Sequence, residues 1–247
     1  MATKEWQAAS FSHPGYRRPL NEDRYLIRSD DHFWLVADGM GGHHRGDFAS
    51  NMVIEVTEEL PISGSLTTRA EQVRSALAAG HERLRQVSAN SEADVICGTT
   101  VTCLLIQESE GVVQLAGDSR LYRWRHHTLM PMTRDHSYVE ELVQQGELSP
   151  KDAEQDPRQH IITRAIGMDQ PLAIEQVAFS VDADDRFLLC TDGLYGELDA
   201  GFISAALGNA STADEAASAL LEGALAGAAD DNITGVVVFP TDDAPQT

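Results

Sequence analysis

Four aspartates occupy similar positions in this 247-residue sequence, each at one end of an apolar run. Three follow such a run and adjoin a glycine, and the fourth precedes the last run; they are Asp38, Asp118, Asp192 and Asp231. Short apolar runs of this kind are typical of buried strands, and the ends of strands in one sheet system can converge at one edge. Carboxylate oxygens suit hard cations such as Mg²⁺ and Mn²⁺. The pattern therefore favours a metal site built from oxygen ligands, whereas zinc would need His or Cys at metal spacing.

Each of these aspartates also has an ordinary interpretation. An Asp-Gly pair at the end of a strand is usually a turn, because both residue types accept turn geometry. Four aspartates in such positions can also coincide in a chain with 39 Asp and Glu residues. The surrounding sequence has to decide between a turn and a metal site.

The charge balance narrows the classes of partner. The chain carries 18 Lys and Arg against 39 Asp and Glu, for a net charge of −21. Nucleic acids and anionic membranes are bound by neutralising phosphates with Lys and Arg, so this composition argues against both partners. A phosphorylated substrate would be repelled as well, unless cations lie at the site.

The cysteines and the N-terminus indicate a cytoplasmic protein. Cys97, Cys103 and Cys190 lie in apolar stretches without CxxC spacing, which predicts buried, reduced thiols in a reducing compartment. The N-terminus lacks the basic-then-apolar pattern of a signal peptide. The apolar runs are far shorter than a membrane span.

Periodicity predicts grouped strands and grouped helices. The expected strands are 6–12, 24–28, 33–37, 99–106, 112–117, 121–124, 174–181, 186–191 and 233–239, with Gly111 marking a tight turn. Helical spacing is expected through 48–60 and 73–87, and a last helix is expected to begin at a capping box formed by Thr212 and Glu215. A polar insert, residues 135–167, is also expected to be helical, with Ser149 as an N-cap. This order differs from a regular βαβ alternation and favours an α+β domain of antiparallel sheets covered by helices.

Eight short motifs in order make the chain resemble the metal-dependent type 2C (PPM) Ser/Thr protein phosphatases in their compact bacterial form. The motifs are RPLNED at 18–23, VADGMGGH at 36–43, CGTT at 97–100, GDSR at 117–120, TRDHS at 133–137, RAIG at 164–167, TDGL at 191–194 and DNIT at 231–234. The resemblance implies a central β-sandwich of two antiparallel sheets flanked by α-helical layers. It also implies one catalytic domain over 1–240, a flap at about 135–167, and a disordered tail at 241–247.

The resemblance also implies a set of metal ligands for Mn²⁺ or Mg²⁺, with two ions in the core site. By position, Asp38 bridges the two ions and the backbone carbonyl of Gly39 supports one of them. Asp192 and Asp231 complete the protein ligands of the second ion, and Glu22 acts through a water molecule.

A weaker third ion is implied at Asp118 together with Asp192. Asp23 is expected to orient its neighbours, as residues behind metal ligands do.

Two further residues receive catalytic roles from the resemblance. Arg18 matches the arginine that binds the substrate phosphate, since a guanidinium fork pairs with two phosphoryl oxygens; Arg17 is the alternative. His43 is the candidate acid for the leaving group, with His44 or a water on the third ion as alternatives. His136 is expected to anchor the insert.

The expected reaction is hydrolysis of phosphoserine and phosphothreonine in proteins by a water that bridges two ions. One alternative is a metal phosphoesterase acting on small phosphomonoesters or nucleic acid. A second is a pseudophosphatase that has kept the fold as a binding module; the intact set of aspartates favours activity. The expected partners are phosphorylated proteins, among them a cognate Ser/Thr kinase or its target in bacterial signalling, with the chain acting as a monomer.

Overall fold

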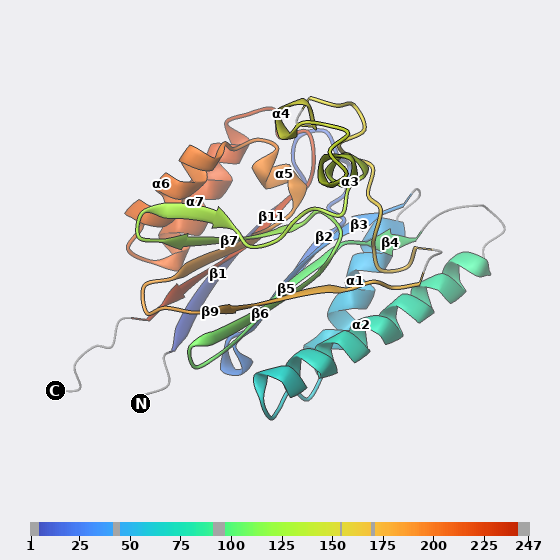
Figure 1. Ribbon diagram of the computed structural model, residues 1–247, viewed down its shortest axis with the longest axis horizontal. Helices are drawn as coiled ribbons and strands as arrows, with labels where there is room; N and C mark the ends of the chain where they lie inside the picture. The colour runs from blue at the N-terminus through green and yellow to red at the C-terminus, as the bar shows by residue number, and fades with distance from the viewer. Residues whose placement is uncertain (1–4, 42–44, 91–96, 154, 169–170, 242–247) are drawn as a thin grey trace.

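The computed structural model describes residues 5–41, 45–90, 97–153, 155–168 and 171–241. In this part of the chain, two antiparallel sheets lie face to face between two layers of helices (Figure 1). His43, its alternative His44, and residues 242–247 of the tail expected at 241–247 lie outside the described residues. Thr241 donates backbone and side-chain hydrogen bonds to the carbonyl of Glu5, at 3.0 and 2.9 Å.

The two sheets contain the predicted strands. One sheet has the order β1 (Trp6–His13), β11 (Ile233–Pro240), β10 (Arg186–Cys190), β7 (Arg120–Arg125) and β8 (Thr128–Pro131). The other has the order β2 (Asp23–Arg28), β3 (Phe33–Met40), β5 (Val101–Gln107), β6 (Glu110–Ala116) and β9 (Glu175–Ser180), and the short β4 (Gly98–Thr99) pairs with the end of β3. The α+β class and the antiparallel sandwich are confirmed.

Strand β3 shows why its sequence is apolar at every position from 33 to 37. Phe33 and Leu35 pack toward the helices on the outer face of the sheet. Trp34 and Val36 pack into the space between the two sheets. Because both faces are covered, the strand lacks the alternation of a half-exposed strand.

Helices cover the outer face of each sheet (Figure 1). Helices α1 (Arg45–Glu58) and α2 (Leu66–Ala89) cover the sheet that contains β3. The other sheet is covered by α5 (Asp192–Tyr195), α6 (Ala200–Asn209) and α7 (Ala213–Leu225). The Thr212 cap of α7 is confirmed, since its hydroxyl accepts the Glu215 amide at 3.1 Å.

Several local expectations were wrong. Gly111 lies within β6, where the Phe179 ring packs over it, and the turn lies between Gln107 and Glu110, which pair across the two strands. The insert contains two short helices, α3 (Tyr138–Gln144) and α4 (Pro150–Ala153), and its other described residues form turns, bends and two isolated bridges, Ser137 with Ile162 and Ile166 with Thr99. Its few buried side chains give a long helix little to pack against. The sequence patterns also missed β8, α5 and α6.

The three cysteines are buried, as the apolar stretches around them predicted. Cys97, Cys103 and Cys190 are free and buried. Burial raises the pKa of the Cys103 thiol to about 12, which makes it inert. Across the described residues, no helix is both long enough and apolar enough to cross a membrane.

Candidate active site

Asp38 lies at the end of β3 and is held by two threonines. Its backbone N–H donates to the Thr100 hydroxyl at 3.0 Å, and its carbonyl accepts the Thr100 amide at 2.8 Å. The Thr99 hydroxyl donates to the same carbonyl at 2.9 Å. Strand β3 therefore continues past Ala37. These hydrogen bonds fix the backbone of Asp38, whose side chain belongs to the candidate site.

The glycines next to Asp38 and Asp192 allow close approach of two backbones. A Cβ atom on Gly39 would lie 2.1 Å from the carbonyl oxygen of Gly46 in α1. A Cβ atom on Gly193 would lie 2.0 Å from the carbonyl oxygen of Asn232. These contacts bring α1 and the entry to β11 against the aspartates, which a side chain at either glycine would prevent.

A buried aspartate connects the three segments that carry the site. Asp23 pairs with Asp38 across β2 and β3. Its Oδ2 accepts the hydroxyl of Thr191 at 2.9 Å, directly before Asp192, and that hydroxyl also accepts the amide of Thr234 at 3.1 Å. Asp23 therefore fixes the positions of Asp38 and Asp192 from behind, which agrees with the orienting role predicted for it.

Asp118 is anchored to the same framework. The hydroxyl of its neighbour Ser119 lies 2.7 Å from that of Thr100. The phenol of Tyr195, at the end of α5, donates to the Asp118 carbonyl at 3.0 Å. The side chain of Asp118 is buried, and its Oδ1 has no hydrogen-bond partner among the described residues.

The loop before β2 is fastened to the end of the chain by Asn232. Its Oδ1 accepts the amide of Glu22 at 2.8 Å, and its Nδ2 donates to the carbonyls of Pro14 and Leu20, each at 2.9 Å. The Asn232 side chain therefore holds the loop that contains Arg18 and Glu22 beside the aspartates. The sequence motif contained Asn232, but its positioning role was missed, because the partners are about 210 residues away in sequence.

We expect Asn232→Ala to lower the free energy of unfolding by about 1–2 kcal/mol, because three backbone groups lose their partner in part-buried hydrogen bonds. We also expect a higher KM, because the loop carrying Arg18 is released. Denaturant unfolding and steady-state kinetics test both. The exposed Asn209→Ala is the control and should leave both unchanged; an equally benign Asn232→Ala would contradict the positioning role.

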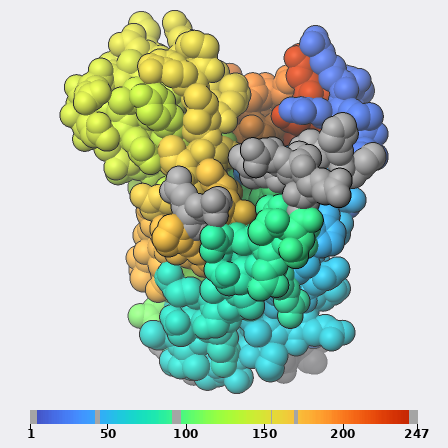
Figure 2. Space-filling view, turned by 90° about the vertical axis from the view of Figure 1, so that its right-hand side faces the viewer, coloured from blue at the N-terminus to red at the C-terminus, as the bar shows by residue number. Residues whose placement is uncertain are grey.

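Most of the predicted site residues line one cleft of about 720 Å³. Its lining includes Arg18, Glu22, Asp38, Gly39, Asp192 and Asp231. Figure 2 shows a hollow between the yellow-green flap and the blue and red segments, which come from the early and late parts of the sequence. Asp118 is buried behind this lining, and the flap adds the exposed His160, which the sequence patterns did not single out.

The carboxyl groups of the cleft are close enough to disturb one another. Burial and the charges of Asp23, Asp192 and Asp118 raise the pKa of Asp38 well above its usual range. Burial and Asp192 raise the pKa of Asp118 to about 8. Burial and the charge of Asp231 also raise the pKa of Asp192, while a hydrogen bond with Asp38 acts in the opposite direction.

Two basic side chains line the cleft in the described part of the chain, Arg18 and His160, and Arg18 is the one that carries a permanent charge. Its Nη2 lies 2.8 Å from Oδ2 of Asp231, and both side chains are about half exposed. The charges of Asp38 and Asp192 also act on it and help to raise its pKa. One guanidinium cannot neutralise this group of carboxylates, so the cleft keeps an excess of negative charge.

The residues present fit divalent cations. Buried carboxylates that repel one another, together with the unpartnered Oδ1 atoms of Asp23 and Asp118, are stabilised when a cation replaces the missing charge. In the described part of the chain, no three His, Cys, Asp or Glu side chains are already gathered around one point. Mg²⁺ and similar ions keep several waters and need only one or two carboxylates each, which suits this spacing.

The flap is anchored at its base beside the cleft. The backbone N–H of Gly117 donates to Nδ1 of His136 at 3.2 Å, and the backbone N–H of His136 donates to the carbonyl of Gly117 at 2.9 Å. Asp135 forms a two-point ion pair with Arg120, at 2.9 and 2.7 Å, and the Arg120 guanidinium stacks 3.6 Å over the ring of Tyr195. The anchoring role predicted for His136 is confirmed.

Comparisons with known proteins identify the family of this chain. Residues 16–225 match the family described as Protein phosphatase 2C. The serine/threonine phosphatase stp of Listeria monocytogenes is 32% identical over 231 residues, covering 91% of this chain and 92% of that protein. The serine/threonine protein phosphatase PstP of Mycobacterium tuberculosis is 33% identical over 239 residues, covering 95% of this chain but 45% of PstP.

Solved structures show the same fold. PppA, described as a key regulatory component of T6SS in Pseudomonas aeruginosa, is 35% identical, with a TM-score of 0.89 over 97% of this chain and 99% of that one. The catalytic domain of PstP in complex with two manganese ions is 31% identical, with a TM-score of 0.84 over 96% and 99%. The chain therefore belongs to the protein phosphatase 2C family and is a metal-dependent protein serine/threonine phosphatase.

Proposed function

We propose that the cleft hydrolyses phosphoserine and phosphothreonine with two divalent ions, Mn²⁺ or Mg²⁺, held around Asp38. The observation that carries this proposal is the convergence of carboxylates from β3, α5 and the entry to β11 into one cleft. When bound, the ions activate the attacking water and place positive charge near the phosphoryl oxygens. The remaining steps belong to side chains of this chain.

We assign the ligand set by the position of each group in the cleft. The carboxylate of Asp38 would contact both ions, and the carbonyl of Gly39 would contact one of them. Asp192 and Asp231 would hold the second ion. The Glu22 carboxylate, which accepts the Asp47 amide at 3.3 Å at the start of α1, would act through water.

Asp118 forms the weaker third site together with Asp192. Its burial supports this proposal, because an unpartnered carboxylate oxygen so close to Asp192 gains from any cation that lies between them. Tyr195 and Ser119 hold its backbone, so the side chain has little freedom to turn away.

Arg18 binds the substrate phosphate. Its fork of N–H donors matches two phosphoryl oxygens, and its pairing with Asp231 holds it at the mouth of the cleft. Asp231 would also hold the second ion, and the guanidinium released from this carboxylate would turn toward the phosphate. Arg17, the alternative, pairs with Asp230 at 2.7 Å and is more exposed, so Arg18 is the better assignment.

The acid for the leaving group stays a prediction. His43 is the sequence candidate and lies outside the described residues. The cleft lining also includes His160 from the flap, close enough for its charge to act on Asp192. Either imidazole would deliver a proton to the departing serine or threonine oxygen.

The wider role follows from charge and similarity. A net charge of −21 supports a partner other than nucleic acid or membrane. We propose that residues 1–240 form one monomeric catalytic domain that opposes a Ser/Thr kinase in the cytoplasm of a bacterium. The similarity to PppA, a regulatory component of a secretion system, supports a signalling role.

One assay tests the reaction and its metal requirement together. We expect Mn²⁺ to support hydrolysis of a phosphothreonine peptide much faster than of the matching phosphotyrosine peptide. EDTA should stop the reaction and excess Mn²⁺ should restore it, because the carboxylates need cations to bind a dianionic phosphate. Hydrolysis that continues unchanged in EDTA would refute the metal mechanism.

A further inference from the structure

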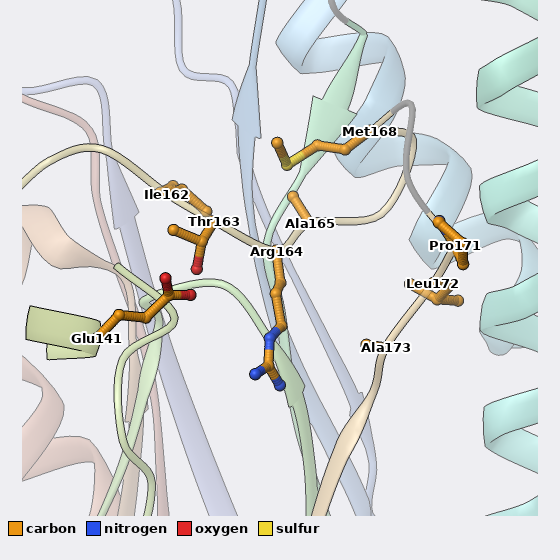
Figure 3. A pocket seen from close by; sticks show the side chains of 9 residues that line it. All are labelled: Glu141, Ile162, Thr163, Arg164, Ala165, Met168, Pro171, Leu172 and Ala173. Carbon is orange, nitrogen blue, oxygen red and sulfur yellow. The ribbon is translucent and has the colours of Figure 1, made fainter. Parts of the chain in front are cut away.

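A second cavity lies at the base of the flap, directly beside the catalytic cleft. It has a volume of about 400 Å³, and its lining includes Glu141, Arg164, Met168, Pro171 and Leu172 (Figure 3). Ile162 lines both this cavity and the catalytic cleft. A protein chain whose phosphorylated residue occupies the cleft would therefore pass next to the second cavity, named here the Arg164 pocket.

The charge of Arg164 lacks a carboxylate partner among the described residues. Its Nη1 atom lies 3.5 Å from Nε2 of His136. Two other arginines of this region are paired, Arg134 with Glu140 at 3.3 Å and Arg158 with Asp156 at 2.7 Å. In a chain with a net charge of −21, an arginine without a carboxylate partner beside a phosphate-binding cleft is available for an anion.

The surroundings of Arg164 support this interpretation. Burial lowers the pKa of His136, and the positive charge of Arg164 contributes to that lowering. Because Nδ1 of His136 accepts the Gly117 amide, a neutral imidazole carries its proton on Nε2, which lies 3.1 Å from the Glu175 carboxylate, and among the described residues no carboxylate oxygen pairs directly with the Arg164 guanidinium. In Figure 3 the Arg164 side chain extends between Glu141 and Thr163 on one side and Pro171, Leu172 and Ala173 on the other.

We propose that the Arg164 pocket binds an aspartate or glutamate side chain of the substrate protein, close in sequence to the phosphorylated residue. This inference rests on the proposed function, because it places the phosphate in the adjacent cleft. The guanidinium fork pairs with the carboxylate, and the apolar wall of Met168, Pro171 and Leu172 covers the methylene groups beside it. Glu141 on the opposite side disfavours a second carboxylate and limits the pocket to one.

The test uses phosphothreonine peptides with neutral flanks, into which one aspartate is placed at each position in turn, on either side of the phosphothreonine. For the Mn²⁺-loaded protein, we expect one position to raise kcat/KM by about two- to fivefold, the range of a partly exposed ion pair. Arg164→Gln should abolish this gain, and Arg164→Lys should retain part of it. Glu141→Gln should enlarge it.

Two controls separate the pocket from other effects. Arg83→Gln removes the same charge from an exposed position on α2 and should keep the full preference for aspartate. Hydrolysis of p-nitrophenyl phosphate, which is too small to reach the pocket from the cleft, should be the same in all variants. Equal losses on this substrate and on every peptide in Arg164→Gln would mean that the arginine is structural and would overturn the proposal.

The remaining outcomes are also decisive. If neutral phosphopeptides are hydrolysed but no aspartate position is preferred, the pocket proposal is wrong while the proposed function stands. A preference for lysine that Glu141→Gln removes would also overturn it. If no phosphopeptide is hydrolysed at all, the proposed function fails and this inference fails with it.

Discussion

Asp38→Asn is expected to lower kcat/KM on a phosphothreonine peptide by about 10³-fold or more, because ion-based stabilisation of the transition state contributes several kcal/mol and each 1.4 kcal/mol is tenfold in rate. The amide keeps the size and shape of the side chain but removes the negative charge that would attract both ions. Initial rates at saturating Mn²⁺ provide the measurement.

The fold should survive this substitution. Asp38 is held through its backbone by Thr99 and Thr100, and its carboxylate is destabilised by its neighbours. Removing that charge should leave the metal-free protein at least as stable at neutral pH, as measured by thermal unfolding. A loss of activity combined with a large loss of stability would mean that Asp38 is structural.

Asp230→Asn is the matched control. Asp230 lines the same cleft and pairs with Arg17, but its side chain is half exposed. An exposed pair contributes about 0.2–1 kcal/mol, so kcat/KM should change by about fivefold at most. Near-normal turnover of Asp38→Asn in Mn²⁺ would show that the bridging role is assigned to the wrong residue.

The second large effect is a loss of stability of the metal-free protein as the pH rises. Burial raises the pKa of Asp23 from 3.8 to about 7, and burial and Asp192 raise that of Asp118 to about 8. The folded protein therefore binds more protons than the unfolded chain between about pH 4 and pH 8. Stability must fall with pH across this window, and the cost is complete above the folded pKa values.

The size of this cost follows from the shifts. A shift of one pKa unit corresponds to about 1.4 kcal/mol, so the coupled carboxyl groups together cost on the order of several kcal/mol. Urea unfolding in EDTA, repeated from pH 5 to pH 8, measures the slope directly. Excess Mn²⁺ at pH 8 should restore stability, by about 2.7 kcal/mol at a concentration 100 times its Kd.

Asp23→Asn separates this effect from general charge repulsion in an acidic chain. The variant removes one buried titrating group, so the slope between pH 4 and pH 7 should become shallower. Asp214→Asn, on the exposed surface of α7, should leave it unchanged. A metal-free protein whose stability is flat or rises over this window would contradict the raised pKa values.

The likeness to phosphatases that act on proteins bears on the alternatives to the proposed activity. A pseudophosphatase would be expected to lack ligands, yet Asp38, Asp192 and Asp231 line one cleft, with Asp118 buried behind it. A phosphoesterase limited to small substrates would have little use for a flap and a second pocket beside the cleft. Protein phosphatase activity accounts for both features, and the relatives carry that activity in their names.

The sequence by itself determined most of the strands, the helices α1, α2 and α7, and the types of residue that carry the chemistry. Strand β3 could be predicted because a continuous apolar run needs a cover on both faces, and the helix after Thr212 because its cap is local. The aspartates could be proposed as ligands because each ends or begins such a run. All these signals depend on residues within about ten positions of one another.

Only the tertiary structure decided how these pieces meet. Arg18 and Asp231 are 213 residues apart in sequence, and the Asn232 contacts with the Glu22 loop are nearly as distant, so no local pattern predicts them. The glycine beside Asp38 has the form of a turn in the sequence, but in the fold it lies within β3 because β4 pairs with it and Gly46 packs against it. Contacts between distant backbones depend on the packing of whole layers. The same packing buries Asp118, which raises its pKa, and it also forms the Arg164 pocket.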